Sequence, residues 1–153
     1  MMQIAKITAG CFGIGYIRGG GTIAALVTAL IWWRAAAAGI TRETMIAATV
    51  AIIVIGIVTS HIVEKDWGKD SSKVVIDEVA GMCVSLLLLP TGWVWVTAAL
   101  VLFRFFDIVK PWYIRKTESL PTGWGVMMDD LLAGVYTNGL LQITAVLIAW
   151  QHS

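Results

Sequence analysis

Charged residues are scarce in this sequence of 153 residues. Asp, Glu, Lys and Arg make up 14% of it, whereas hydrophobic residues make up 58%. A soluble domain carries roughly 25% charged residues, so this chain has too few charges to cover a surface that faces water. The composition therefore predicts a single domain, residues 1–153, embedded in a lipid bilayer. The formal net charge of +1 argues against nucleic acid as a partner, because nucleic-acid-binding proteins need a concentrated basic surface.

Residues that carry catalysis in many hydrolases are also few. Histidine occurs only as His61 and His152, and the two cysteines, Cys11 and Cys83, belong to no Cys-x-x-Cys or Cys/His cluster. These counts argue against a structural zinc site and against a phosphatase with a histidine nucleophile. No Gly-x-Ser-x-Gly sequence is present, which excludes the nucleophile elbow of serine hydrolases. Chemistry in this chain must therefore depend on carboxylates and on Lys and Arg.

Long apolar segments dominate the rest of the chain. Residues 44–63 contain no Asp, Glu, Lys or Arg and match the ~20 residues that a helix needs to cross a bilayer. Pro90 and Gly92 interrupt a later apolar stretch and indicate a turn, which predicts a short helical hairpin. We therefore predict an all-α, polytopic membrane helical bundle with about five apolar segments, the middle two forming the hairpin: residues 22–33, 44–63, 79–89, 93–106 and 129–150.

Basic residues are distributed unequally between the two sides of the predicted bundle. If the hairpin crosses the membrane, nine basic residues lie on one side, and Arg34 and Arg42 lie on the other. This excess predicts that the larger group faces the cytoplasm. Nine of the ten acidic residues share that side, and the positive-inside rule does not explain carboxylates. The nine basic residues are Lys6, Arg18, Lys65, Lys69, Lys73, Arg104, Lys110, Arg115 and Lys116.

Two acidic pairs stand where predicted helices begin, and each is followed by an apolar step that ends in Ala-Gly. They are Asp77–Glu78 in VIDEVAG and Asp129–Asp130 in MMDDLLAG. Carboxylates at a helix start stabilise the helix macrodipole, and this alone would explain one pair. Two pairs of the same form indicate a site for Mg²⁺, which prefers hard oxygen ligands. Ala80–Gly81 and Ala133–Gly134 are small enough to let the two helices approach closely.

A third motif, residues 103–112, combines cations with a carboxylate. Arg104, Asp107 and Lys110 are spaced three residues apart and would lie along one face of a helix. Arg and Lys bind phosphate, and Asp107 can orient either cation or reach the metal. A salt-bridged face at the membrane interface explains the same spacing without any ligand.

Two weaker signals lie elsewhere. Gly-Gly-Gly-Thr at residues 19–22 can present N–H groups to a phosphate at a helix start, although glycine before a helix is commonly just a turn. His61 can donate a proton or bind a ligand, although a histidine at an interface is commonly just amphipathic.

These motifs together resemble the phosphatidylglycerophosphatase A family, over most of the chain, in the same order and with similar spacing. The family usually has a proline shortly before Gly-Thr, which this chain lacks, and a proline where Tyr113 stands here. The matching elements are GGTIAAL (residues 20–26), His61 followed by Asp70, VIDEVAGM (75–82), FRFFDIVKPW (103–112) and GVMMDDLLAGVY (125–136).

The resemblance implies Mg²⁺-dependent hydrolysis of phosphatidylglycerophosphate to phosphatidylglycerol and phosphate, at the cytoplasmic face of a bacterial inner membrane. Water activated by Mg²⁺ is the expected nucleophile, with an aspartyl-phosphate intermediate as the alternative. The alternative function is a small membrane transporter or assembly subunit that uses the carboxylates as a cation path. The predicted metal ligands are Asp77, Glu78, Asp129 and Asp130; the catalytic set adds Asp107 and Lys110; and the substrate contacts are Thr22, His61, Arg104 and Lys110.

Overall fold

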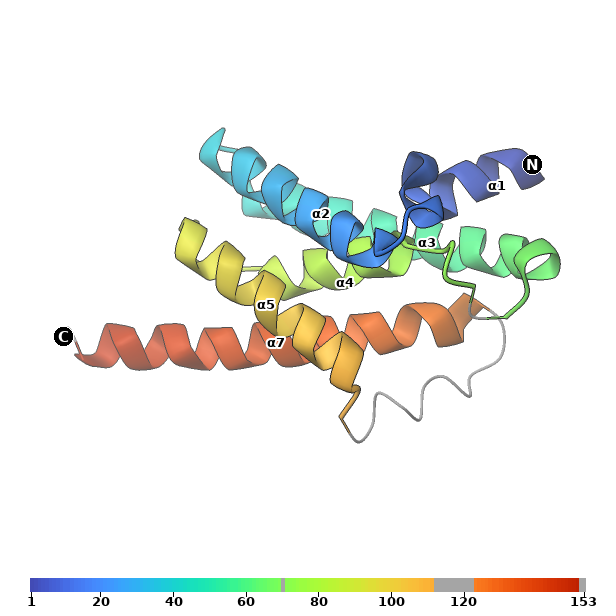
Figure 1. Cartoon of the computed structure of the whole chain (residues 1–153). Coiled ribbons are helices and arrows are strands. Elements are labelled where there is room, and N and C mark those ends of the chain that lie inside the picture. Colours follow the sequence, from blue (N-terminus) through green and yellow to red (C-terminus); the bar gives the residue numbers. More distant parts are fainter. Residues whose placement is uncertain (70, 112–122, 152–153) are drawn as a thin grey trace.

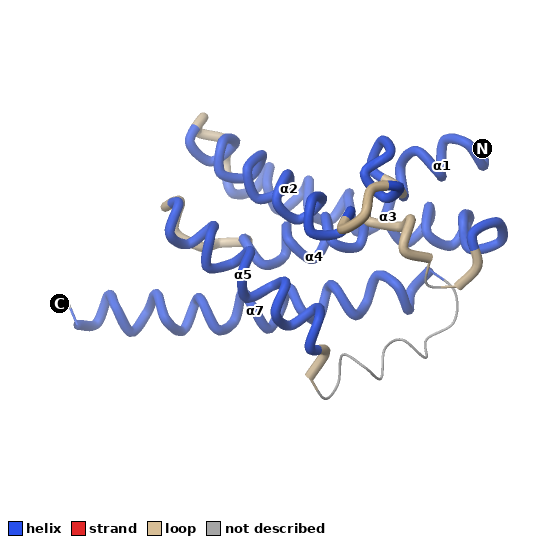
Figure 2. Tube along the Cα trace, in the orientation of Figure 1, coloured by secondary structure: helices blue, strands red, loops and turns tan. Residues whose placement is uncertain are grey.

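The structure, a computed structural model, describes residues 1–69, 71–111 and 123–151, and every regular element in these ranges is a helix (Figures 1 and 2). This confirms the predicted all-α class. The helices are α1 (Met2–Ala9), the 3₁₀-helix η1 (Cys11–Tyr16), α2 (Gly20–Ala37), α3 (Arg42–Trp67), α4 (Ile76–Leu86), α5 (Trp93–Val109) and α7 (Gly123–Gln151).

Three of these helices, α2, α3 and α7, are long and apolar enough to cross a membrane. The predicted number of about five apolar segments is not confirmed as a number of membrane spans. The reason is length: α4 has 11 residues, roughly half of what a bilayer requires. The chain is therefore a membrane protein in which long helices surround a shorter one.

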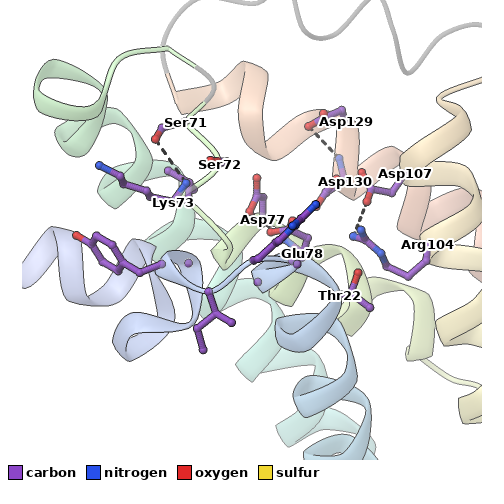
Figure 3. A pocket seen from close by; sticks show the side chains of 18 of the residues that line it. Thr22, Ser71, Ser72, Lys73, Asp77, Glu78, Arg104, Asp107, Asp129 and Asp130 are labelled. Carbon is purple, nitrogen blue, oxygen red and sulfur yellow. Dashed lines mark hydrogen bonds and ion pairs between the residues drawn. The ribbon is translucent and has the colours of Figure 1, made fainter.

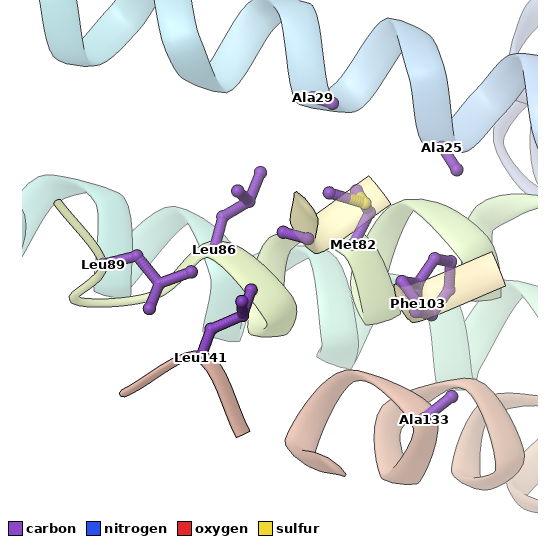
Figure 4. Close-up of a cluster of buried hydrophobic side chains, with 9 residues drawn as sticks. Ala25, Ala29, Met82, Leu86, Leu89, Phe103, Ala133 and Leu141 are labelled. Carbon is purple, nitrogen blue, oxygen red and sulfur yellow. The ribbon is translucent and has the colours of Figure 1, made fainter. Parts of the chain in front are cut away.

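Helix α4 is the centre of the bundle. It packs against α2, α3, α5 and α7, and its contact with α7 is the most extensive in the described structure. Buried side chains of α2, α5 and α7 meet those of α4 in one cluster (Figure 4). This buried cluster is formed by Ala25, Ala29, Met82, Leu86, Leu89, Ala99, Phe103, Ala133 and Leu141.

The predicted hairpin is present, with α4 and α5 joined by residues 87–92. Asn138 of α7 holds the end of α4, because its side-chain amide donates to the carbonyl oxygens of Ser85 at 3.1 Å and Leu87 at 2.7 Å. These bonds satisfy acceptors that a helix end leaves without partners. Because α5 runs back along α4 (Figure 1), its last turn returns to the end of the bundle where α4 begins.

Glycines allow α4 and α7 to approach each other, as the Ala-Gly steps predict. A Cβ atom on Gly81 would lie 2.6 Å from the Asp130 carbonyl oxygen and 2.6 Å from the Phe103 ring, and one on Gly134 would lie 2.5 Å from the Gly81 carbonyl oxygen. Real Cβ atoms do not tolerate such distances, so only glycine fits at both positions. The contact fixes the backbone of Asp130 against α4.

The N-terminal segment contains helices that the sequence did not predict. Ala5 and Ala9 of α1 are buried in one cluster with Val63 of α3, and this tertiary packing stabilises a helix too short to form alone. The Ala9 carbonyl oxygen accepts a hydrogen bond of 2.9 Å from the Val75 N–H. Segment 1–16 therefore braces the residues that lead into α4.

We predict that Gly81→Ala destabilises the bundle. The new methyl group would overlap the Asp130 backbone and the Phe103 ring, and such overpacking costs about 1–3 kcal/mol. Gly139→Ala is the matched control, because nothing lies within 4 Å of a Cβ there. Thermal unfolding in detergent should show a lower midpoint for Gly81→Ala only; equal midpoints would contradict the close contact.

Candidate active site

Charged residues gather in an open pocket of about 660 Å³ at one end of the bundle. The starts of α2 and α4, the end of α5 and the second turn of α7 form its walls, together with residues 15–19 and 71–74. Carboxylates of α4, α5 and α7 line this space (Figure 3). The pocket contains all but one of the residues that the sequence predicted for the site: Thr22, Asp77, Glu78, Arg104, Asp107, Lys110, Asp129 and Asp130.

The first acidic pair lies in the first turn of α4, as predicted. The Glu78 N–H donates to Asp77 Oδ1 at 3.1 Å, and the positive end of the α4 dipole favours both carboxylates. Burial raises the pKa of the Asp77 carboxyl well above its usual range, and the negative charge of Glu78 raises it further. The dipole therefore does not fully compensate this pair.

The second acidic pair is not at a helix start, and this part of the prediction was wrong. Helix α7 begins at Gly123, so Asp129 and Asp130 are its seventh and eighth residues and lie beyond the turn where the dipole acts. Both are buried, with 6% and 3% of their surface exposed. Macrodipole stabilisation, which would explain one pair without any ligand, cannot explain this one.

Two cations from the third motif each hold one carboxylate. Arg104 donates to Asp107 at 2.5 Å and Lys110 donates to Asp129 at 2.6 Å. Lys110 does not share a helical face with Arg104, contrary to the prediction, because α5 ends at Val109 and Lys110 adopts a left-handed backbone with φ 45°. This turn precedes Pro111 and directs the Lys110 side chain toward α7.

No Lys or Arg among the described residues forms an ion pair with the other three carboxylates of the pocket. Asp77, Glu78 and Asp130, here called the carboxylate triad, offer oxygen atoms that lie within 4.8 Å of one another. Glu78 Oε2 and Asp130 Oδ2 are buried and have no hydrogen-bond partner among the described residues. Buried acceptors of this kind require a partner, and hard oxygen donors suit a divalent cation. The triad can therefore hold a metal ion; Asp129, the fourth predicted ligand, contacts Lys110 instead.

A glycine also makes room for Glu78, a member of the triad. A Cβ atom on Gly21 would lie 1.9 Å from Glu78 Oε1, so α2 and the Glu78 carboxylate can meet only because residue 21 has no side chain. Gly19, with φ 79°, precedes the helix, and the first N–H groups of α2 have no acceptor within the helix. Thr22 and this helix start line the pocket, an arrangement that can bind an anion.

Two elements of the sequence prediction lie elsewhere. His61 is exposed on α3 and does not line the pocket. Asp70 lies outside the described residues. The sequence in turn did not single out Ser71, Ser72 and Lys73, which line the wall opposite Arg104 in Figure 3; the polar composition of residues 64–78 was the only signal for them. Arg18 also lines the pocket, and no pattern in the sequence indicated this.

Known proteins are similar to this chain over much of its length. The family profile described as Phosphatidylglycerophosphatase A matches residues 7–145. A protein of Bacteroides thetaiotaomicron named "Putative phosphatidylinositol-3-phosphatase" is 42% identical over 130 residues, covering 80% of this chain and 81% of that protein. No solved structure matches.

Two further relatives carry the name Phosphatidylglycerophosphatase A. The protein of Escherichia coli is 44% identical over 92 residues, covering 58% of this chain and 54% of the relative. The protein of Haemophilus influenzae is 46% identical over 69 residues, covering 44% of this chain and 42% of the relative. The profile spans nearly the whole chain, including all the pocket helices, and the chain therefore belongs to the phosphatidylglycerophosphatase A family of membrane phosphatases.

Proposed function

We propose that the chain hydrolyses the terminal phosphate of phosphatidylglycerophosphate, giving phosphatidylglycerol and inorganic phosphate, with Mg²⁺ bound at the carboxylate triad. The observation that supports this proposal most directly is the triad, which has two buried oxygen atoms without a hydrogen-bond partner among the described residues. It lies next to Arg104, Lys110 and the start of α2. The names of the E. coli and H. influenzae relatives support this substrate. The site therefore combines groups for a cation with groups for a phosphate.

The residues of the pocket would have separate roles. Asp77, Glu78 and Asp130 hold the metal, while Asp129 positions Lys110. A bound Mg²⁺ would neutralise phosphate charge and acidify a water molecule. Arg104 retains a buried Nε donor without a partner among the described residues, which is available to a phosphoryl oxygen.

Hydrolysis of the monoester would transfer the phosphoryl group to water. The water oxygen forms a new bond to phosphorus, the bond from phosphorus to the glycerol oxygen breaks, and one water proton ends on the glycerol oxygen. Negative charge develops on the phosphoryl oxygens and on the leaving oxygen. Arg104, Lys110 and the N–H groups at the start of α2 stabilise that charge from fixed positions.

The position of the pocket supports a site at the cytoplasmic face of a bacterial inner membrane. Arg34, in the last turn of α2, and Arg42, at the start of α3, lie at the end of these helices away from the pocket. The seven other basic residues in the described ranges lie near the pocket end: Lys6, Arg18, Lys65, Lys69, Lys73, Arg104 and Lys110. This asymmetry follows the positive-inside rule.

The Bacteroides relative favours a second candidate substrate, phosphatidylinositol 3-phosphate, because its name specifies that activity and its match covers most of both chains. Both lipids carry a phosphate monoester on a headgroup that is joined to the lipid by a phosphodiester. The triad, Arg104 and Lys110 would bind the two monoesters alike.

We predict that the purified protein releases phosphate from phosphatidylglycerophosphate in the presence of Mg²⁺. Release should stop with EDTA and return when Mg²⁺ is restored in excess, because the triad needs a cation to approach an anionic substrate. The same measurement of released inorganic phosphate with phosphatidylinositol 3-phosphate and with phosphatidic acid ranks the substrates. Full activity in EDTA would refute the metal assignment, and higher kcat/KM for the inositol lipid would favour the second candidate.

A second prediction concerns Asp130→Asn. It removes a triad charge while keeping the side-chain size, so we expect at least a hundredfold loss of kcat and at least tenfold weaker binding of Mn²⁺, measured by electron paramagnetic resonance as a substitute for Mg²⁺. Asp66→Asn is the control, since Asp66 pairs with Lys6 outside the pocket. Unchanged Mn²⁺ affinity in Asp130→Asn would remove this residue from the metal site.

Single cysteines test which side of the membrane the pocket faces. They are introduced into a chain whose Cys11 and Cys83 are replaced by alanine. Ser72→Cys lies on the pocket side and Ala38→Cys lies in the turn between α2 and α3. In spheroplasts, a membrane-impermeant maleimide should label Ala38→Cys at once and Ser72→Cys only after lysis. The reverse pattern would place the pocket on the outer side of the membrane.

A further inference from the structure

An apolar groove runs between α2 and α3, away from the pocket. These two helices are consecutive in the chain and are joined by the short turn 38–41, yet they make almost no direct contact with each other and pack instead on α4. The space between them has a volume of about 260 Å³. It has two walls, α2 and α3, that are candidate membrane spans, so any opening between them faces lipid.

The residues that line the groove recur at helical spacing along α2 and α3, so they form one continuous surface. None of these lining residues is charged. Of its two threonines, Thr28 donates to the Ala24 carbonyl oxygen at 2.8 Å, and Thr44 shares a hydrogen bond of 3.1 Å with Thr41. The groove therefore offers a ligand mainly apolar contact. It is lined by Thr28, Ile31, Trp32, Ala35, Ile40, Thr44, Met45, Ala48, Ile52, Val79 and Cys83.

The floor of the groove connects it to the active site. Val79 belongs to the groove, and the preceding residue, Glu78, belongs to the carboxylate triad. On α2, Thr22 lines the active-site pocket and Thr28 lines the groove; six residues of helix separate them by about 9 Å. The two cavities thus follow one another along α2 and α4, with the polar pocket at the starts of these helices and the apolar groove farther along them.

From this continuity we infer that the groove binds an acyl chain of the phospholipid substrate and so sets the headgroup over the carboxylate triad. The inference rests on the proposed function, since it takes the substrate to be a phospholipid monoester. A lipid whose chain lies between α2 and α3 has its headgroup at the starts of α2 and α4, where the triad is. Each methylene buried in the groove adds to the affinity of long-chain substrates.

Ala48→Trp tests the inference, with Ala47→Trp as its matched control. The two residues are neighbours on α3 and both are exposed, but only Ala48 lines the groove. We expect Ala48→Trp to raise KM for long-chain phosphatidylglycerophosphate about tenfold, because excluding about two methylenes costs that factor. Its kinetics on the water-soluble short-chain substrate, and all kinetics of Ala47→Trp, should equal wild type. Equal effects on both substrates, or on neither, would overturn the inference.

Photolabelling gives a readout that does not depend on turnover. Phosphatidylglycerophosphate with a diazirine in its acyl chain should label α2 and α3 at the groove in wild type and in Ala47→Trp, but not in Ala48→Trp. Equal labelling by phosphatidylcholine with the same chain, undiminished by excess substrate, would identify a resident membrane lipid and overturn the inference. Absence of phosphate release by the wild type from every lipid in the panel would instead refute the proposed function.

Discussion

Repulsion among carboxylates is the constraint on which the rest of this molecule depends. Five acidic side chains line one pocket, where burial weakens the screening by water and strengthens every charge interaction. Arg104 and Lys110 each hold one of them. The other three are the triad, whose oxygen atoms lie within 4.8 Å of one another. Such a cluster is stable only if its negative charge is neutralised, and a divalent cation bound at the proposed metal site would supply the positive charge.

The helices are arranged so that this cluster forms. Helix α4 is too short to cross a bilayer, but its start carries two triad members and its sides contact four other helices. The hairpin after it brings the end of α5, with Arg104 and Lys110, back to the same end of the bundle. Glycine then sets the last distances: Gly81 admits the backbone of Asp130, and Gly21 admits the carboxylate of Glu78. Side chains at these two positions would separate the groups that must meet.

Much of this was predictable from sequence, and the failures have physical causes. The helix start at Asp77 and Glu78, the turn at Pro90 and Gly92, and the close glycine contact follow from local patterns, whereas the same acidic pattern at Asp129 and Asp130 lies beyond the first turn of its helix. The start of α7 was misplaced because Gly123 and Gly125 weaken a helix by propensity, whereas buried Met127 stabilises it by packing. Helix α1 was missed because it is stabilised by packing against α3. Lys110 was predicted for the site but placed on the wrong helical face, because its direction depends on a left-handed turn. Arg18 and Lys73 reach the pocket only through the folding of two loops.

The same geometry limits what the triad can recognise. In the proposed reaction, the carboxylates would hold a metal and the cations would bind phosphoryl oxygens, so both groups would contact only the phosphate monoester, which both candidate lipids carry. Neither the triad nor Arg104 and Lys110 can therefore distinguish a glycerol headgroup from an inositol headgroup. The rest of the headgroup would then lie against the opposite wall, formed by residues 15–19 and 71–74. On the proposed function, selectivity among phospholipid monoesters would therefore depend on those two loops, while the metal site would determine only that a monoester is hydrolysed.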